Sequence, residues 1–159
     1  MKKVKIGGIL QGRGLASISI TSIPDRPGIA SLIFRTLGSH GINVEFIVHT
    51  IDEQVSSHIT LCVDRKDLEE TLFLMESQRD VISYKALLHN SQVGLISIFG
   101  PHFRERPGLA GIFFRALASA EVNILAISTS VSTCSCLIEE TDIAKAVTAL
   151  SQAFDLPGG

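Results

Sequence analysis

Two short segments of the sequence combine residue types that could bind a small polar molecule. Pro27-Gly28 and Pro107-Gly108 lie 80 residues apart, and each directly precedes an apolar run with helical spacing. The first amide groups of a helix have no partner within the helix, and they carry its positive dipole end. Such a helix start can bind a carboxylate, and a glycine there lets a ligand approach the backbone closely.

Other polar residues stand near these two steps. The carboxylate of Asp25 could accept a hydrogen bond from the amino group of a ligand, or it could cap the helix that follows. Asn43 and Asn123 occupy the same place in the two segments, at the entrance to an expected strand. Their side chains could face a ligand between that strand and the helix start, or they could hold the local turn.

Few residues are suited to catalysis or metal binding. His49 and His58 belong to two segments that should pair as strands, but no third ligand has suitable spacing for zinc. We interpret both as polar strand residues near a sheet edge, with an acid–base enzyme as the alternative. Cys134 and Cys136 share one strand face, and we interpret them as a buried, inert pair because a zinc site needs two more ligands. We therefore expect no catalytic residues, no metal and no cofactor.

An internal repeat organises the whole chain. The blocks that follow the two Pro-Gly steps align without a gap, so that Phe34 corresponds to Phe114 and Asn43 to Asn123. A repeat of this length is one supersecondary unit used twice. In the first copy, residue patterns predict strands at 16–22, 42–51, 56–63 and 81–88, a helix after Pro27 that ends at Gly38 and Gly41, and a helix after Asp64. The order is βαββαβ, the ferredoxin-like arrangement of the α+β class.

The second copy is one strand short. Its predicted elements are strands at 95–99, 123–130 and 134–138, a helix from 109, and a last helix that begins at Thr141 or Asp142. Residues 4–10 also read as a strand, and they have no place in the first copy. Because an open sheet edge is a liability, we predict that this N-terminal strand completes the second sheet. The expected domains are 16–90 for the first unit, and 4–10 plus 93–156 for the second.

Composition narrows the class of protein. The chain has 159 residues, 45% of them hydrophobic, and a net charge of −2, which gives no electrostatic footprint for nucleic acid or an anionic membrane. No apolar run is long enough to span a bilayer. Three cysteines without a recognisable secretory signal indicate reduced thiols and a cytoplasmic protein. Each unit is small for a stable core, so we expect a homodimer.

The ordered residues of both copies resemble the tandem ACT domains of aspartate kinases. In this sequence the resemblance rests on SIPDRPGIA at 22–30, GINV at 41–44, SIFG at 97–100, RPGLA at 106–110, VNI at 122–124, ISTS at 127–130 and the closing helix at 146–154. It covers nearly the whole chain. The fold it implies is a pair of ferredoxin-like units, with the N-terminal strand in the second.

The resemblance also implies a function. In aspartate kinases this pair is the regulatory, non-catalytic region, which binds lysine or threonine at interfaces between ACT units of two chains. Carried over, the effector contacts fall on the first helix start and second strand of each copy: Asp25, Gly28, Ile29, Ala30, Asn43 and His49, and Pro107, Gly108, Leu109, Asn123, Ile124 and Ser128.

The sequence departs from the family pattern around these contacts. Val131 stands where a glutamate is usual, Thr133 where a basic residue is usual, and Ser57-His58 where Thr-Asp is usual. His49-Thr50 likewise replaces a glutamine–asparagine pair. These differences leave open a free-standing sensor, a regulatory subunit of a kinase, or a piece of a longer protein. The alternative function is a structural assembly module that binds no ligand.

Overall fold

The computed structural model describes residues 2–101 and 103–158, and the chain divides into two compact units. We name Gly14–Gln92 the inserted unit, and Met1–Arg13 together with Val93–Gly159 the split unit. Two long strands, β2 (Gly8–Pro24) and β5 (Ala86–Phe99), pass from one unit into the other and lie side by side. Each unit therefore takes one half of β2 and one half of β5.

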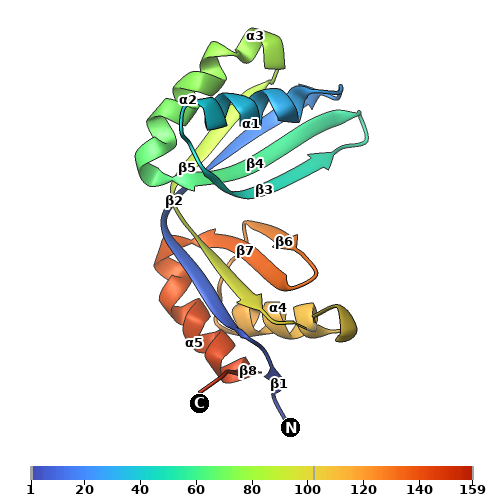
Figure 1. Ribbon diagram of the computed structural model, residues 1–159, viewed down its shortest axis with the longest axis vertical. Coiled ribbons are helices and arrows are strands. Elements are labelled where there is room, and N and C mark those ends of the chain that lie inside the picture. Colours follow the sequence, from blue (N-terminus) through green and yellow to red (C-terminus); the bar gives the residue numbers. More distant parts are fainter. Residues whose placement is uncertain (1, 102, 159) are drawn as a thin grey trace. The chain divides into compact units, whose positions relative to one another are not determined.

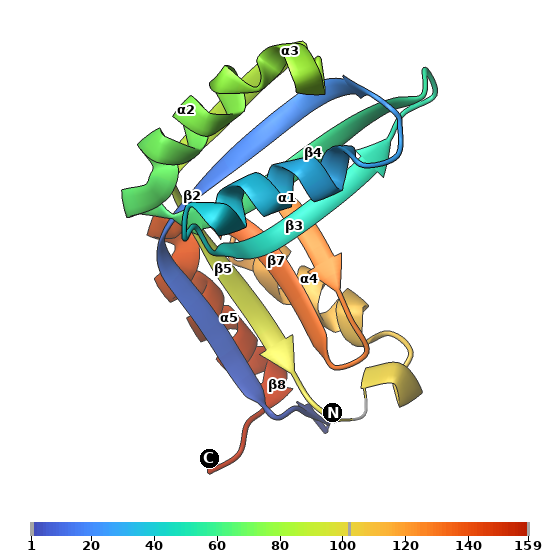
Figure 2. The ribbon, with the colours of Figure 1, turned by 45° about the horizontal axis from the view of Figure 1, so that its top comes forward.

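In the inserted unit the strand order is β3-β4-β2-β5. Strand β4 pairs antiparallel with both of its neighbours, so that Leu61 lies opposite Ile18 on β2 and Ile47 on β3. Helices α1 and α2 cover the same face of this sheet (Figures 1 and 2), and the core between them includes Ile33 and Met75. Besides β2 and β5, the elements are α1 (Ile29–Ser39), β3 (Val44–Ile51), β4 (Ser56–Asp64), η1 (Arg65–Asp67), α2 (Leu68–Ser77) and α3 (Arg79–Ile82).

In the split unit the strand order is β2-β5-β7-β6, with α4 and α5 packed over a second core. The first half of β2 supplies the strand that the second copy lacks, which confirms the predicted fold class. A two-stranded parallel ribbon is added, in which Lys5 lies opposite Asp155. The elements are β1 (Val4–Lys5), η2 (Phe103–Glu105), α4 (Leu109–Ser119), β6 (Ala126–Thr129), β7 (Thr133–Glu139), η3 (Glu140–Asp142), α5 (Ile143–Ala153) and β8 (Phe154–Asp155).

The two repeat helices begin and end in the same way. Gly28 before α1 and Gly108 before α4 both have a left-handed backbone, with φ of 93° and 88°, which glycine adopts at little cost. At the other end, the amide of Ile42 donates to Leu37 O and that of Val122 donates to Leu117 O, both at 3.0 Å. These bonds satisfy carbonyls left open by the last helical turn, so the sequence repeat corresponds to a repeat of conformation.

Some predicted boundaries are wrong. The strands expected at 4–10 and 16–22 are the short β1 and one continuous β2, which runs through residues 11–15 although Gly14 there has a left-handed backbone, with φ of 70°. Val81 and Ile82 belong to α3 and not to a strand. In α3 Ile82 is buried and Val81 is exposed. A strand would also place two successive side chains on opposite sides, so this pair of residues does not distinguish a strand from a helical turn. Pro27 and Gly28 precede α1, whose first helical residue is Ile29.

None of the helices among the described residues is long and apolar enough to cross a membrane.

Candidate functional site

A cavity of about 240 Å³ lies at the start of α1 in the inserted unit. It is lined by the turn after β2, by the start of α1, and by residues of β3 and β4. The lining residues are Asp25, Arg26, Gly28, Ile29, Ala30, Ser31, His49, Ser57 and Ile59. All the residues predicted for the first copy are brought together here except Asn43.

A chain of hydrogen bonds crosses this cavity. The hydroxyl of Ser57, which is buried, donates to Asp25 Oδ1 at 3.2 Å, and His49 Nε2 lies 3.1 Å from the same hydroxyl oxygen. Because the single hydroxyl proton of Ser57 is directed to Asp25, the shared proton between His49 and Ser57 must come from Nε2. His49 is therefore not placed to deprotonate Ser57, as a general base would be. The arrangement suits binding rather than nucleophilic catalysis.

The start of α1 carries partial positive charge, opposite in sign to the Asp25 carboxylate. No side chain caps α1, since the N-cap residue is Gly28 and the carboxylate of Asp25 is directed to Ser57 instead. Of the two roles that the sequence left open for Asp25, helix capping is thus not the one observed. The first amides of α1 have no acceptor within the helix, and the positive dipole end lies beside a carboxylate. The Arg26 guanidinium anchors this turn by donating to Val81 O.

His58 does not join the cavity with His49. In the β3–β4 pairing His49 lies opposite Ile59 and Thr50 lies opposite His58, so the two imidazoles project from opposite faces of the sheet. The Ser22 amide donates to His58 Nδ1 at 3.1 Å, and His58 Nε2 lies 2.9 Å from Asp52 Oδ2. The hydrogen bond with His58 contributes most to holding the pKa of Asp52 below its usual value. His58 thereby ties the β3–β4 turn to the irregularity in β2 that precedes Asp25.

A second cavity of about 190 Å³ lies at the equivalent place in the split unit, beside the start of α4. Of the residues predicted for the second copy, Gly108 and Leu109 line it. Glu105 is the equivalent of Asp25, but no carboxylate is among the described residues that line this cavity. Arg106 lines it as its equivalent Arg26 lines the first cavity. The lining residues are Phe103, Arg106, Gly108, Leu109, Ala110, Thr129, Ser130, Thr133 and Cys134.

Residues 16–76 and residues 96–154 each match a family model described as ACT domain. The chain belongs to the ACT-domain family. An aspartokinase of Mycolicibacterium smegmatis is 31% identical over 160 residues, which is 99% of this chain but 38% of that protein. The ACT domains here thus span well under half the length of the curated relatives they match.

Solved structures that match nearly the whole of this chain are also aspartate kinases or their regulatory subunits. The regulatory subunit of aspartate kinase from Thermus thermophilus is 27% identical, with a TM-score of 0.85 over 94% of this chain and 99% of that one. The aspartate kinase of Synechocystis is 28% identical, with a TM-score of 0.89 over 97% of this chain and 28% of that one. The tandem ACT arrangement therefore resembles the regulatory region of aspartate kinases.

Several residues carried over from the family lie away from the two ACT cavities. Asn43 follows the far end of α1, a helix of 11 residues and so about 16 Å long, and it is not among the residues lining the first cavity. Asn123 and Ile124 follow α4 in the same way. Ser128 neighbours Thr129, which lines the second cavity, and alternate strand residues face opposite sides. Pro107, Asn123, Ile124 and Ser128 are not among the described residues that line it.

Other lining residues were missed from the sequence. Ser57 was noticed only as a departure from the family pattern, yet it joins Asp25 to His49. The short segment between β3 and β4 could have identified Ser57, because a tight hairpin there brings the residues after it back beside His49. Thr133 was also noticed as a departure, and its hydroxyl lies 2.8 Å from that of Ser130.

The three cysteines are free and buried. Burial raises the pKa of the Cys62 and Cys136 thiols to about 12, so both are protonated at neutral pH. Within residues 2–101 and 103–158, no three His, Cys, Asp or Glu side chains form a group that could hold a metal ion.

Proposed function

We propose that this chain is a non-catalytic regulatory module that binds a free amino acid in the cavity beside α1. The observation that supports it most is the pairing of the Asp25 carboxylate with an uncapped helix start across one small cavity. An amino acid carries an ammonium group and a carboxylate on one carbon, and it needs these two partners close together. The second cavity has no carboxylate among its described lining residues, so it is less suited to an ammonium group.

The size of the cavity suits a small amino acid. At about 30 Å³ for each water-sized group, 240 Å³ accommodates about eight such groups. The family resemblance implies threonine and lysine as the first candidates, and threonine is the one that this volume favours, because the side chain of lysine is longer. The output we propose is control of an aspartate-kinase activity, whether the chain acts as a separate subunit or as part of a longer protein.

Assembly with a second copy is part of this proposal. Among the described strands, β3 is one edge of the sheet in the inserted unit and β6 is one edge of the sheet in the split unit. Both expose large apolar side chains, Ile47 and Ile51 on β3 and Ile127 on β6. An exposed apolar edge strand favours pairing with another chain. We therefore propose a homodimer, in which effector binding would favour one arrangement of the subunits.

The test is isothermal titration calorimetry against the twenty amino acids, with the oligomeric state followed by analytical ultracentrifugation. For a ligand that binds, Asp25→Asn should weaken affinity by about tenfold or more, because a charge-assisted hydrogen bond is lost. Asp80→Asn is the matched control, since Asp80 is exposed on α3 and lines neither ACT cavity. Binding equally strong in Asp25→Asn would refute the assigned site.

A second candidate is an assembly module that binds no ligand. The exposed apolar residues on β3 and β6 favour it, because they support pairing of chains whether or not a ligand is present. It predicts a dimer whose melting temperature no amino acid raises at millimolar concentration. A ligand that binds only the native state must raise that temperature by mass action, so thermal shift measurements separate the two candidates.

A further inference from the structure

A third cavity, of about 250 Å³, lies in the split unit and shares only Phe103 and Arg106 with the lining of the cavity beside α4. It is formed where the N-terminal segment passes the end of β5 and the turn before η2. The residues that define its chemistry are Lys5, Ile6, Gly7, Gly100, Phe103 and Arg106. Nothing in the proposed amino-acid site uses Lys5, Ile6, Gly7 or Gly100.

Close backbone packing gives this cavity fixed walls. The amide of Gly7 donates to Phe99 O at 2.7 Å, and that of Gly100 donates to Ser132 O at 3.0 Å. A Cβ atom on Gly100 would come within 2.8 Å of the Phe103 ring, so that ring packs directly against the backbone. Because both glycine amides already have acceptors, the backbone at these positions cannot bind an anion. Any charged ligand must be held by side chains.

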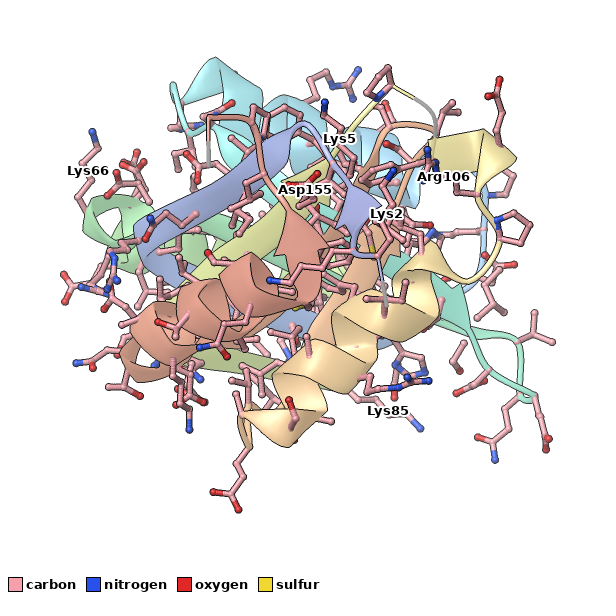
Figure 3. All side chains as sticks on the ribbon, turned by 90° about the horizontal axis from the view of Figure 1, so that it is seen from below. Lys2, Lys5, Lys66, Lys85, Arg106 and Asp155 are labelled. Carbon is pink, nitrogen blue, oxygen red and sulfur yellow. The ribbon has the colours of Figure 1, made fainter. Side chains whose placement is uncertain are left out.

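Two side chains supply positive charge. Lys5 and Arg106 line the same cavity, and neither side chain has a hydrogen bond or ion pair with another described residue. Figure 3 labels both, together with Asp155, which lies opposite Lys5 in the β1–β8 ribbon. Glu105 precedes Arg106 and has another interaction. Neither Asp155 nor Glu105 is among the described residues that line the cavity.

The remaining wall is apolar. Ile6 is buried, and Phe103 presents its ring. At about 30 Å³ for each water-sized group, the cavity holds about eight of them. Two cationic side chains beside an apolar wall suit a ligand that has a carboxylate at one end and a hydrocarbon chain at the other. An amino acid fits poorly, because its ammonium group would face two cations and no carboxylate.

We propose that this cavity is a separate binding site for a small aliphatic monocarboxylate that lacks an α-amino group. Lys5 and Arg106 hold the carboxylate, while the hydrocarbon body lies against Ile6 and Phe103. Phe103 and Arg106 also line the cavity beside α4, so an occupant here contacts a residue of the second ACT cavity. The proposal does not depend on amino-acid binding beside α1.

The experiment is a titration of the full chain with 4-methylpentanoate, followed by the amide signals of Gly7 and Gly100 in nitrogen–proton correlation spectra. We expect saturable shifts at both amides in the millimolar range. Leucine and the neutral 4-methylpentanamide should each bind at least about tenfold more weakly, because one adds an ammonium group and the other removes the charge. Inorganic phosphate should produce no saturable shift at comparable concentration, since it has no hydrocarbon body.

Lys5→Gln tests the cation directly. Lys5 is exposed and its backbone pairing is retained, so the variant should fold with an unchanged melting temperature. Its affinity for 4-methylpentanoate should fall by about tenfold. Lys66→Gln is the matched control, since Lys66 is an exposed lysine of η1 in the inserted unit. Any one of three results would overturn the proposal: no saturation at 4-methylpentanoate concentrations of about 20 mM, equal binding of the amide, or unchanged affinity in Lys5→Gln.

Discussion

Gly94 on β5 allows α5 to pack against the sheet of the split unit. An added Cβ atom would lie 2.7 Å from Ile143 Cδ1 and 2.9 Å from the backbone oxygen of Gly12. Ordinary carbon contacts are about 3.5–4.0 Å, so Gly94→Ala is short of space by close to 1 Å on the Ile143 side. Ile143 is fully buried at the start of α5, and the other contact is to backbone, which cannot rotate away.

The expected cost combines two effects. Overpacking of this kind costs about 1–3 kcal/mol, while replacing glycine by alanine returns about 0.4–1 kcal/mol through the unfolded chain. We expect the free energy of unfolding of Gly94→Ala to fall by about 1–2 kcal/mol, measured by urea denaturation. Gly38→Ala is the control, because Gly38 is in α1 with open space around it and should gain about 0.5–1 kcal/mol.

A double-mutant cycle tests whether the contact with Ile143 is responsible. Ile143→Val removes Cδ1, the atom closest to the added Cβ, so Gly94→Ala should cost less in that background by about 0.5 kcal/mol or more. If Gly94→Ala stabilises the chain as Gly38→Ala does, the close-packing argument is refuted, and if the two changes are additive, Ile143 Cδ1 is not the contact responsible.

Three further predictions concern the inserted unit. The pKa of Asp52 is lowered from its ordinary 3.8, chiefly by the hydrogen bond with His58, so this carboxylate stabilises the fold above that pH and the benefit is lost as pH falls through the folded pKa. Asp52→Asn should therefore be less stable near neutrality and show a shallower loss below about pH 4 in urea midpoints. Cys62, with a pKa of about 12, should react with a thiol reagent at pH 8 only as the native structure opens, and fast labelling would contradict its burial. Ser57→Ala should cost about 1 kcal/mol in thermal unfolding, since Asp25 loses its donor, and an unchanged melting temperature would argue against that contact.

The repeat made most of the fold predictable. Apolar residues at Ile29, Ile33 and Leu37 have helical spacing, and all three are buried on α1. Gly41 was expected near the end of that helix, and it has the left-handed backbone that such an end needs. Glu121 takes the same conformation after α4, with φ of 57°. Local signals of this kind act over a few residues, which is why they can be recognised without a structure.

The boundaries that depend on packing were harder to predict. Residues 4–10 were predicted as one strand, but β1 ends at Lys5 and β2 begins at Gly8. Gly7 and Gly8 lie close to the Phe99 ring, which they can do because they have no side chain of their own. The membership of the candidate site is another such case. Ser57 enters the first cavity through the register of β3 on β4, while Asn43 is separated from it by the length of α1. Strand register and helix length are set when the whole unit folds, so a short sequence motif does not show which residues they bring to the site.

The exchange of strand halves between the two units has a consequence for the order of folding. Gly12 and Gly94 come into contact across 82 positions of sequence, and closing such a loop in an unfolded chain costs about 4 kcal/mol of entropy. In the inserted unit the Lys85 amide donates to Thr21 O, which joins the same two strands from the other end. Once that unit has formed, β2 and β5 are already adjacent, and the remaining pairing extends along them residue by residue. Protection from hydrogen exchange should therefore arise in the inserted unit first, and the split unit should follow it.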